Sequence, residues 1–267
     1  METLRILDKI YSYQDLAPLL SAPKKILIDN KSKQRIKESY KRLDEIISSG
    51  ETIYGVNTGF GRLSKIKINK ADQKKLQLNL VRSHAAGIGN NLDIGIVRIA
   101  MTLKLISYAR GYSGVHPDTV SQLIQFLNND MIPVVPERGS VGASGDLAPL
   151  AHIACSLIGE GKLIHNNKIV ASKTVLKNMS IKPLSLKQKD GISLVNGTQI
   201  STAIAIKSLH NCDIILDSAD AIGALSVETS LSSRETFRSS IHRLKKHRGQ
   251  IISARNIWKM TKNSDVV

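Results

Sequence analysis

One stretch of small residues could support chemistry that ordinary side chains do not offer. Residues 139–152 read GSVGASGDLAPLAH, in which Gly142-Ala143-Ser144-Gly145 leads directly into Asp146 and an apolar segment. Three explanations fit such a run: a flexible turn, a loop that binds an anion through its backbone amides, or a backbone that folds closely enough on itself to react. A flexible turn explains the glycines but not the adjacent Ala-Ser-Gly. We refer to residues 139–146 as the small-residue loop.

An anion-binding loop has two features against it. Successive amides ahead of a helix can hold a phosphate, but no lysine follows in the position of a Walker A loop. The carboxylate of Asp146 would also repel an anion. The nearby GIGN at Gly87–Asn90 is an equally poor dinucleotide motif, because it follows a predicted helix rather than a strand.

Three other stretches combine glycine with a side chain able to act on a small molecule. They are YGVNTGFG at Tyr54–Gly61, RSHAAGIG at Arg82–Gly89 and LVNGTQ at Leu194–Gln199. Each also has an ordinary structural explanation. Tyr54 could pack on its neighbours in a loop, His84 could be a satisfied core histidine, and Asn196 could cap a helix or occupy a turn.

Taken together, the four motifs resemble, in content and order, the signatures of the histidine/phenylalanine ammonia-lyase family. IHRLKKHRGQ at Ile241–Gln250 resembles a weaker downstream motif of that family. The resemblance covers nearly the whole chain but only the N-terminal half of a family sequence, since family members are roughly twice this long. It implies a mainly α fold: an N-terminal α+β region with the prosthetic-group loop at 1–196, then the start of a long central helical bundle at 197–267.

The resemblance implies that the small-residue loop makes its own electrophile. In the family, the amide nitrogen of the Gly attacks the carbonyl carbon of the Ala, and two waters leave to give 4-methylidene-imidazol-5-one (MIO). Here the ring would form from Ala143, Ser144 and Gly145, with Ser144 supplying the exocyclic methylidene carbon. Gly145 has no Cβ to obstruct the closure. No metal or diffusible cofactor is implied.

The resemblance also implies roles for three side chains. Tyr54 would be the general base that removes the β-proton of the substrate, which requires surroundings that lower a phenol pKa ordinarily near ~10. His84 would face the substrate side chain, where its imidazole can hydrogen-bond a substrate imidazole and a leucine could not. Asn196 would bind the substrate carboxylate or polarise the ring.

These roles predict elimination of ammonia from L-histidine to give trans-urocanate, a step of histidine degradation. A tyrosine ammonia-lyase is an alternative, because such an enzyme can also carry histidine at the position of His84. Family enzymes are tetramers with further active-site residues downstream of Gln250, so we expect a homo-oligomer or a complementing C-terminal chain. A non-catalytic or split-enzyme half that needs a partner chain is the alternative of a different class.

The elements that must position these residues follow from apolar spacing and capping signals. Asp146 is expected to cap a helix that runs to about Ile158. The segment 198–231 contains no proline and is apolar on most sides, which predicts a helix that needs several neighbours. The other expected elements are a strand at 25–29, helices at 31–47, 71–86 and 92–110, a helix starting at Pro117, a hairpin at 162–171 turning at Asn166-Asn167, and a short helix at 185–193.

Composition argues against two other classes of protein. The formal net charge is +16, but the basic residues are scattered and not interleaved with aromatics, so we expect no nucleic-acid partner. No apolar run is long enough to span a membrane, and the N-terminus lacks the apolar block of a signal peptide. Cys155 and Cys212 lack metal-ligand spacing and are predicted to be free, buried thiols in a cytoplasmic protein.

Overall fold

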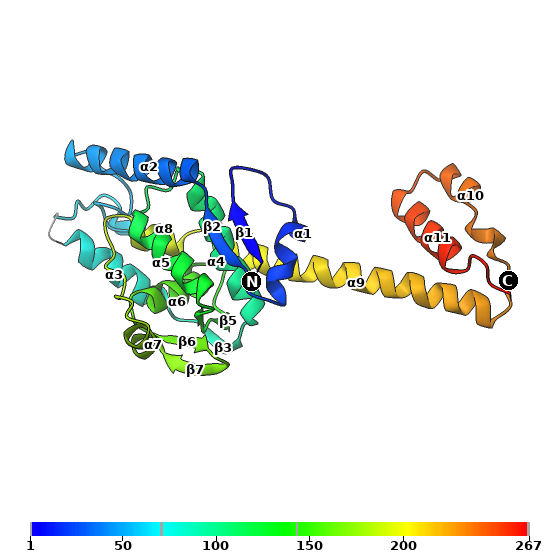
Figure 1. Cartoon of the computed structure of the whole chain (residues 1–267). Helices are drawn as coiled ribbons and strands as arrows, with labels where there is room; N and C mark the ends of the chain where they lie inside the picture. Colours follow the sequence, from blue (N-terminus) through cyan, green and yellow to red (C-terminus); the bar gives the residue numbers. More distant parts are fainter. Residues whose placement is uncertain (1, 70–71, 143, 266–267) are drawn as a thin grey trace. The chain divides into compact units, whose positions relative to one another are not determined.

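The structure, a computed structural model, describes residues 2–69, 72–142 and 144–265 (Figure 1). The chain divides into two compact units, Met1–Lys207 and Ser208–Val267. The division falls inside a long helix, α9 (Gln199–Thr229), because the first turns of this helix bury Ile200, Ala203 and Ile206 in the core of the first unit. The expected domain boundary at 196/197 lies just ahead of this helix.

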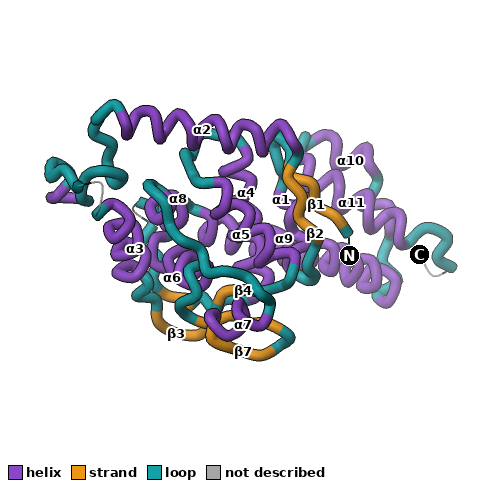
Figure 2. The backbone as a smooth tube through the Cα atoms, turned by 60° about the vertical axis from the view of Figure 1, so that its left-hand side comes forward, coloured by secondary structure: helices purple, strands orange, loops and turns teal. Residues whose placement is uncertain are grey.

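The first unit is mainly helical with three small sheets (Figure 2). Its helices are α1 (Tyr13–Leu16), α2 (Asn30–Ser48), α3 (Gln73–His84), α4 (Ile94–Ala109), α5 (Pro117–Asn128), α6 (Leu147–Leu157), α7 (Ser172–Asn178) and α8 (Asp190–Val195), with 3-10 turns at Ala17–Leu20 and Gly61–Leu63. Its strands are β1 (Thr3–Ile6), β2 (Lys25–Ile28), β3 (Ile88–Asn91), β4 (Ile132–Pro133), β5 (Pro136–Arg138), β6 (Lys162–His165) and β7 (Lys168–Ala171). The mainly α class with an α+β N-terminal region is confirmed.

The sheets are short and local. β1 and β2 pair in parallel, β3 pairs antiparallel with β5, and β6 lies between β4 and β7 in an antiparallel sheet. The predicted hairpin is confirmed: it turns at Asn166 and Asn167, whose φ angles of +51° and +59° suit a two-residue hairpin loop. The predicted strand at 25–29 is confirmed as β2.

Helix α4 forms the centre of the first unit. Twelve of its residues are buried, and it contacts α2, α5, β1, β4 and the 3-10 turn at Ala17–Leu20 (Figure 2). The close approach to that turn requires glycine at position 95, because a Cβ there would lie 2.4 Å from the Leu20 carbonyl oxygen. A helix that is apolar on most of its surface is expected to occupy such a position, so its one lysine, Lys104, is buried with it.

Helices α3, α6 and α8 pack against one another in pairs and carry three of the four motifs (Figure 1). Helix α8 is shorter than the predicted helix at 185–193 and begins later. The left-handed φ of +71° at Lys189 interrupts a helical path. The buried carboxylate of Asp190 also accepts hydrogen bonds from the amides of Lys187 and His116, which holds the preceding segment in a loop.

The second unit contains most of α9, a 3-10 turn at Arg234–Phe237, α10 (Ser239–Leu244) and α11 (Arg248–Met260). Ala224, Val227 and Ile257 form its small apolar cluster, and the Arg234 guanidinium lies 4.0 Å from the centre of the Trp258 ring. Several apolar side chains of α9 are exposed within this unit: Leu209, Ile214, Ile215, Leu216, Ile222 and Leu225. No helix among the described residues is long and apolar enough to cross a lipid bilayer.

Candidate active site

The small-residue loop is held against the segment that follows α8. Gly145 is buried with a φ of +105°, and a Cβ at this position would lie 2.6 Å from the carbonyl oxygen of Gly197. The amide of Asp146 donates a 2.7 Å hydrogen bond to that same oxygen. Only glycine is compatible with this approach. Ser144 is exposed beside it, and Ala143 lies outside the described residues.

Asp146 does not cap the helix that follows it, contrary to the sequence-based prediction. Its side chain makes no hydrogen bond to the first turn of α6. The fully buried carboxylate instead accepts from the Ser140 hydroxyl at 2.7 Å and from the hydroxyl and amide of Ser201 at 2.5 and 2.8 Å. Ser201 lies in the first turn of α9, where backbone amides carry partial positive charge. Asp146 therefore ties the small-residue loop to the start of a different helix.

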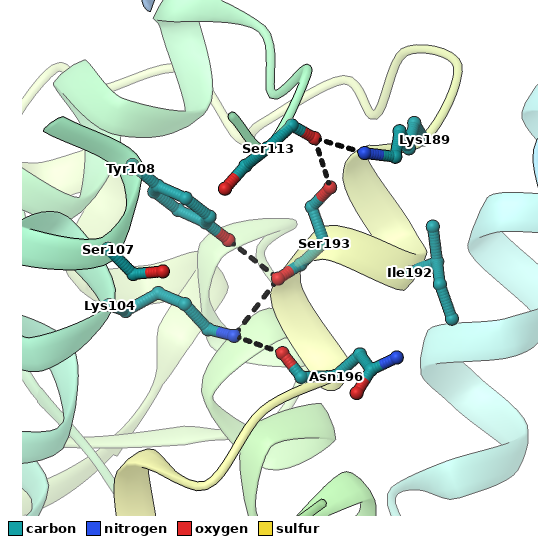
Figure 3. Close-up of a pocket in the computed structure, with 8 residues that line it drawn as sticks. All are labelled: Lys104, Ser107, Tyr108, Ser113, Lys189, Ile192, Ser193 and Asn196. Carbon is teal, nitrogen blue, oxygen red and sulfur yellow. Dashed lines mark hydrogen bonds between the residues drawn. The ribbon is translucent and has the colours of Figure 1, made fainter. Parts of the chain in front are cut away.

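Asn196 directly follows α8, and its backbone carbonyl rather than its side chain is anchored. The carbonyl oxygen accepts a 2.7 Å hydrogen bond from Nζ of Lys104, and Figure 3 shows the side-chain amide on the other side of the residue from Lys104. The same ammonium donates to the Ser193 carbonyl at 3.0 Å, to which the Tyr108 hydroxyl also donates at 2.8 Å. The exposed side-chain amide of Asn196 is thus available to a ligand.

These groups border a cavity of about 180 Å³ lined by both charged and hydroxyl side chains (Figure 3). Burial lowers the pKa of Lys104 to about 7, an effect that the carboxylate of Asp146 opposes. Burial also raises the pKa of Tyr108, and the charge of Asp190 adds to the increase. Sequence reasoning missed Lys104; the signal that could have found it is that only Arg98 and Lys104 are charged in the largely apolar helix α4.

His84 is the last residue of α3 and is half-buried. Its Nδ1 lies 2.8 Å from the Leu80 carbonyl oxygen and 3.2 Å from the Ser83 hydroxyl. Because a carbonyl can only accept, Nδ1 carries the hydrogen of the neutral ring and Nε2 is the acceptor nitrogen. No hydrogen bond to Nε2 is present among the described residues, so this atom can accept a hydrogen bond from a ligand.

Tyr54 lies in a loop that folds back on itself. Its side chain is 58 % exposed, its hydroxyl accepts a 3.3 Å hydrogen bond from the amide of Gly61, and its ring packs edge-to-face on Phe60 with centroids 5.9 Å apart. Gly55 allows this fold, because a Cβ there would lie 2.6 Å from the Phe60 ring. The phenol is therefore positioned at the surface by local contacts.

Gln77 joins three of the motif-bearing segments, and sequence reasoning did not identify it. This fully buried residue of α3 donates through Nε2 to the Gly55 carbonyl at 2.9 Å and accepts through Oε1 from the Ile192 amide at 3.1 Å. A Cβ on Gly191 would lie 2.7 Å from the Gln77 carbonyl oxygen, so α8 lies close against α3 here. A glutamine among the buried positions of an amphipathic helix was the available signal.

His152 connects the segment after His84 to α6. Its Nε2 accepts a 3.1 Å hydrogen bond from the amide of Gly87. Burial lowers the pKa of His152, which keeps the ring neutral and able to accept. The contact gives His152 a structural role.

The two cysteines differ from each other. Cys155 is buried as predicted, and burial raises the pKa of its thiol to about 11, so it stays protonated and unreactive. Cys212 is exposed on α9, so the prediction of a buried thiol is wrong there. The helix is apolar in sequence, but no described element covers this position.

The four motifs thus meet through backbone and buried contacts. Gln77 links the Tyr54 loop to α8, Lys104 holds the end of α8, and Gly197 receives the small-residue loop. Within the described ranges, no hydrogen bond joins the side chains of Tyr54, His84 and Asn196 to one another, and no group of three or more His, Cys, Asp or Glu residues lies together in a way that could hold a metal ion.

Comparison with known proteins gives consistent results. Residues 11–267 match the family model of aromatic amino acid lyases. A histidine ammonia-lyase of Aliivibrio fischeri is 41% identical over 254 residues, which are 95% of this chain and 50% of that protein. Among solved structures, tyrosine aminomutase from Streptomyces globisporus matches with a TM-score of 0.93 and 29% identity over 99% of this chain. Histidine ammonia-lyase from Trypanosoma cruzi matches with a TM-score of 0.87 and 30% identity over 96%.

The matched part of each of these proteins is about half of its length. The share covered is 50% in the Aliivibrio fischeri protein and 50% in each of the two solved structures. The fold of the described chain is therefore that of one half of an ammonia-lyase or aminomutase.

Proposed function

Because the chain belongs to the aromatic amino acid lyase family, we propose that it contributes to elimination of ammonia from L-histidine, giving trans-urocanate in the cytoplasm. The assignment of L-histidine as the substrate rests on the geometry of His84, whose Nε2 can accept a hydrogen bond. The N–H of a substrate imidazole is the complementary donor. The 41% identity to a histidine ammonia-lyase supports the same substrate.

The residues around Gly145 fit a self-formed MIO group. Ring closure joins the amide nitrogen of Gly145 to the carbonyl carbon of Ala143, and one water leaves from that carbonyl while a second carries away the Ser144 hydroxyl. Glycine at 145 permits the close backbone approach, and Gly197 and Asp146 would hold the segment. Once formed, the group would supply an electrophile that activates the substrate for loss of its amino group.

The remaining chemistry falls to side chains of this chain. Tyr54 would remove the β-proton; its side chain is exposed, and its hydroxyl accepts a hydrogen bond from the Gly61 amide, which orients the oxygen that would act as the base. Asn196 would bind the substrate carboxylate through its exposed side-chain amide, since the NH₂ group is a donor. His84 would orient the imidazole of the substrate.

A non-catalytic or split-enzyme half is the second candidate, and a specific observation favours it. Apolar side chains of α9, such as Ile215 and Leu225, are 65% and 60% exposed. Exposed apolar surface of this kind marks an interaction site. A homo-oligomer or a complementary C-terminal chain would cover it and complete the site.

The experiment is to incubate the purified chain with L-histidine or with L-tyrosine and to follow urocanate or coumarate by absorbance. Each incubation is run with the chain alone and with an added C-terminal half of a related histidine ammonia-lyase. Urocanate in either mixture supports the proposal, and urocanate only in the complemented mixture selects the split-enzyme form. Coumarate without urocanate would replace L-histidine by L-tyrosine as the substrate.

A further inference from the structure

A lysine lies buried at the centre of the first unit, and no carboxylate of the described residues is in hydrogen-bond contact with it. Lys104 is 4% exposed, and its Nζ donates to the carbonyl oxygens of Ser193 and Asn196, at 3.0 and 2.7 Å (Figure 3). Removing an ammonium from water is costly unless it is well paired. The fold therefore buries the Lys104 amino group at the C-terminal end of α8, although its desolvation costs free energy.

The acceptors explain why a cation suits this point. The last carbonyls of a helix have no partner within the helix and carry partial negative charge. α8 has only six residues, so it gains little stability from its own hydrogen bonds. An ammonium bonded to two carbonyls can fix where such a short helix ends.

The Asn196 carbonyl that Lys104 binds lies one residue before the contact with the small-residue loop. Asn196 is followed by Gly197, whose carbonyl oxygen receives the Asp146 amide and lies against Gly145. A shift in the end of α8 would therefore move the surface on which Gly145 rests. It would also move the Asn196 side chain, because Lys104 binds the backbone carbonyl of that residue.

We propose that Lys104 is a positioning residue, whose bonds to the end of α8 hold Asn196 and Gly197 in place against the segment that forms the prosthetic ring. The effect of Lys104 on ring formation rests on the proposed function. The contacts themselves do not depend on it. If Lys104 only filled space in the core, its replacement by Met would change neither ring formation nor hydrogen–deuterium exchange at the end of α8.

A second lysine of the same cavity offers a matched control. Lys189 also lines the cavity but donates to the Ser113 carbonyl rather than to the Ser193 and Asn196 carbonyls that Lys104 binds (Figure 3). Lys104→Met and Lys189→Met make the same chemical change at two sites of one cavity. Lys104→Arg keeps a cation with several donors, and the adjacent space of about 180 Å³ can accept part of the larger side chain.

Two readouts are measured on the purified chain and its three variants. The first is the intact mass over time after synthesis, in which ring formation appears as the loss of two waters. The second is hydrogen–deuterium exchange of the peptides that contain the Asp146 amide and the end of α8. Circular dichroism confirms that each variant is folded, which is expected because replacing a buried charge by an apolar group of similar volume often preserves the fold.

We expect Lys104→Met to slow ring formation by about tenfold or more, because the hydrogen bonds to the Ser193 and Asn196 carbonyls are lost. Exchange at Asp146 and at the end of α8 should become faster. Lys189→Met should leave both readouts near those of the wild type, and Lys104→Arg should recover part of each. Wild-type exchange at these amides in Lys104→Met overturns the inference. If the wild-type chain loses no water, the proposed function fails, while the exchange data still decide whether Lys104 holds the end of α8.

Discussion

The carbonyl oxygen of Gly197 accepts a 2.7 Å hydrogen bond from the amide of Asp146. Through this bond the small-residue loop and the segment after α8 form one backbone assembly, although 51 residues separate them in sequence. The Asp146 carboxylate strengthens it by binding the first turn of α9 through Ser201. The geometry of the loop thus depends on two helices that lie beyond it in the chain.

Gly145→Ala should prevent ring formation and destabilise the chain. A Cβ would lie 2.6 Å from the Gly197 oxygen at a φ of +105°, a strain that costs about 1–3 kcal/mol. Thermal unfolding and intact mass measure the two effects. Gly142→Ala is the control, because it has positive φ in the same loop but meets nothing within 4 Å. Equal effects of the two substitutions would contradict the role given to the contact with Gly197.

Gln77→Leu should lower the free energy of unfolding by about 1–3 kcal/mol for each buried group left unpaired, which are the Gly55 carbonyl and the Ile192 amide. Gln73→Leu on the same helix should be nearly neutral, because its buried Oε1 has no hydrogen-bond partner among the described residues and its Nε2 makes a contact of 3.4 Å. Urea unfolding of both variants makes the comparison. A smaller loss for Gln77→Leu than for Gln73→Leu would refute the bridging role.

His84→Leu should reduce kcat/KM for L-histidine by about tenfold to a hundredfold in whichever assembly is active, since a hydrogen bond to the substrate is lost. Ser83→Ala is the control, because Ser83 contacts the same Nδ1 without reaching Nε2. Steady-state kinetics with L-histidine and L-tyrosine report the change. An unchanged preference between the two substrates would show that position 84 does not select the substrate.

The stability contributed by Lys104 should rise with pH. Its pKa is lowered to about 7 in the folded chain and is ~10.4 in an unfolded one. Between these values the unfolded state binds the additional proton, so raising the pH favours the folded state. Tyr108 and Lys189 line the same cavity, and the charge of Asp146 acts on the pKa of Lys104. All three residues are also present in Lys104→Met, so their own titration cancels in a comparison of the two proteins.

The difference in free energy of unfolding between the wild type and Lys104→Met isolates this effect. It should increase in favour of the wild type from about pH 7 to about pH 10 and be flat below that range. Urea unfolding at several pH values measures it. A difference that does not change across the range would mean that the ammonium keeps its ordinary pKa in the folded chain.

Local signals in the sequence predicted much of this fold. The Asn166-Asn167 turn, the position of Pro117 at the start of α5 and the apolar run of α4 depend on neighbouring residues, so the sequence pattern is sufficient for them. Gly145 could also be singled out, but the reason why glycine is required there is its contact with Gly197, which only the folded backbone reveals.

Long-range partners could not be predicted in this way. Asp146 has the sequence position of a helix cap, yet its carboxylate binds Ser201 of α9, 55 residues away. Lys104 and Gln77 are polar residues on buried helix faces, and nothing in their spacing says which carbonyl or amide they reach. The exposure of Cys212 depends on whether another element covers α9, which is a property of the packing and not of the helix itself.

The proposed function depends on conversion of the Ala143-Ser144-Gly145 backbone into an electrophile. The most direct test is the intact mass of the purified chain, followed by digestion and mass measurement of the peptide that contains these three residues. We predict that the whole chain and this peptide are each lighter by two water molecules, and that the loss disappears in Gly145→Ala. A wild-type peptide of full, unmodified mass would contradict it.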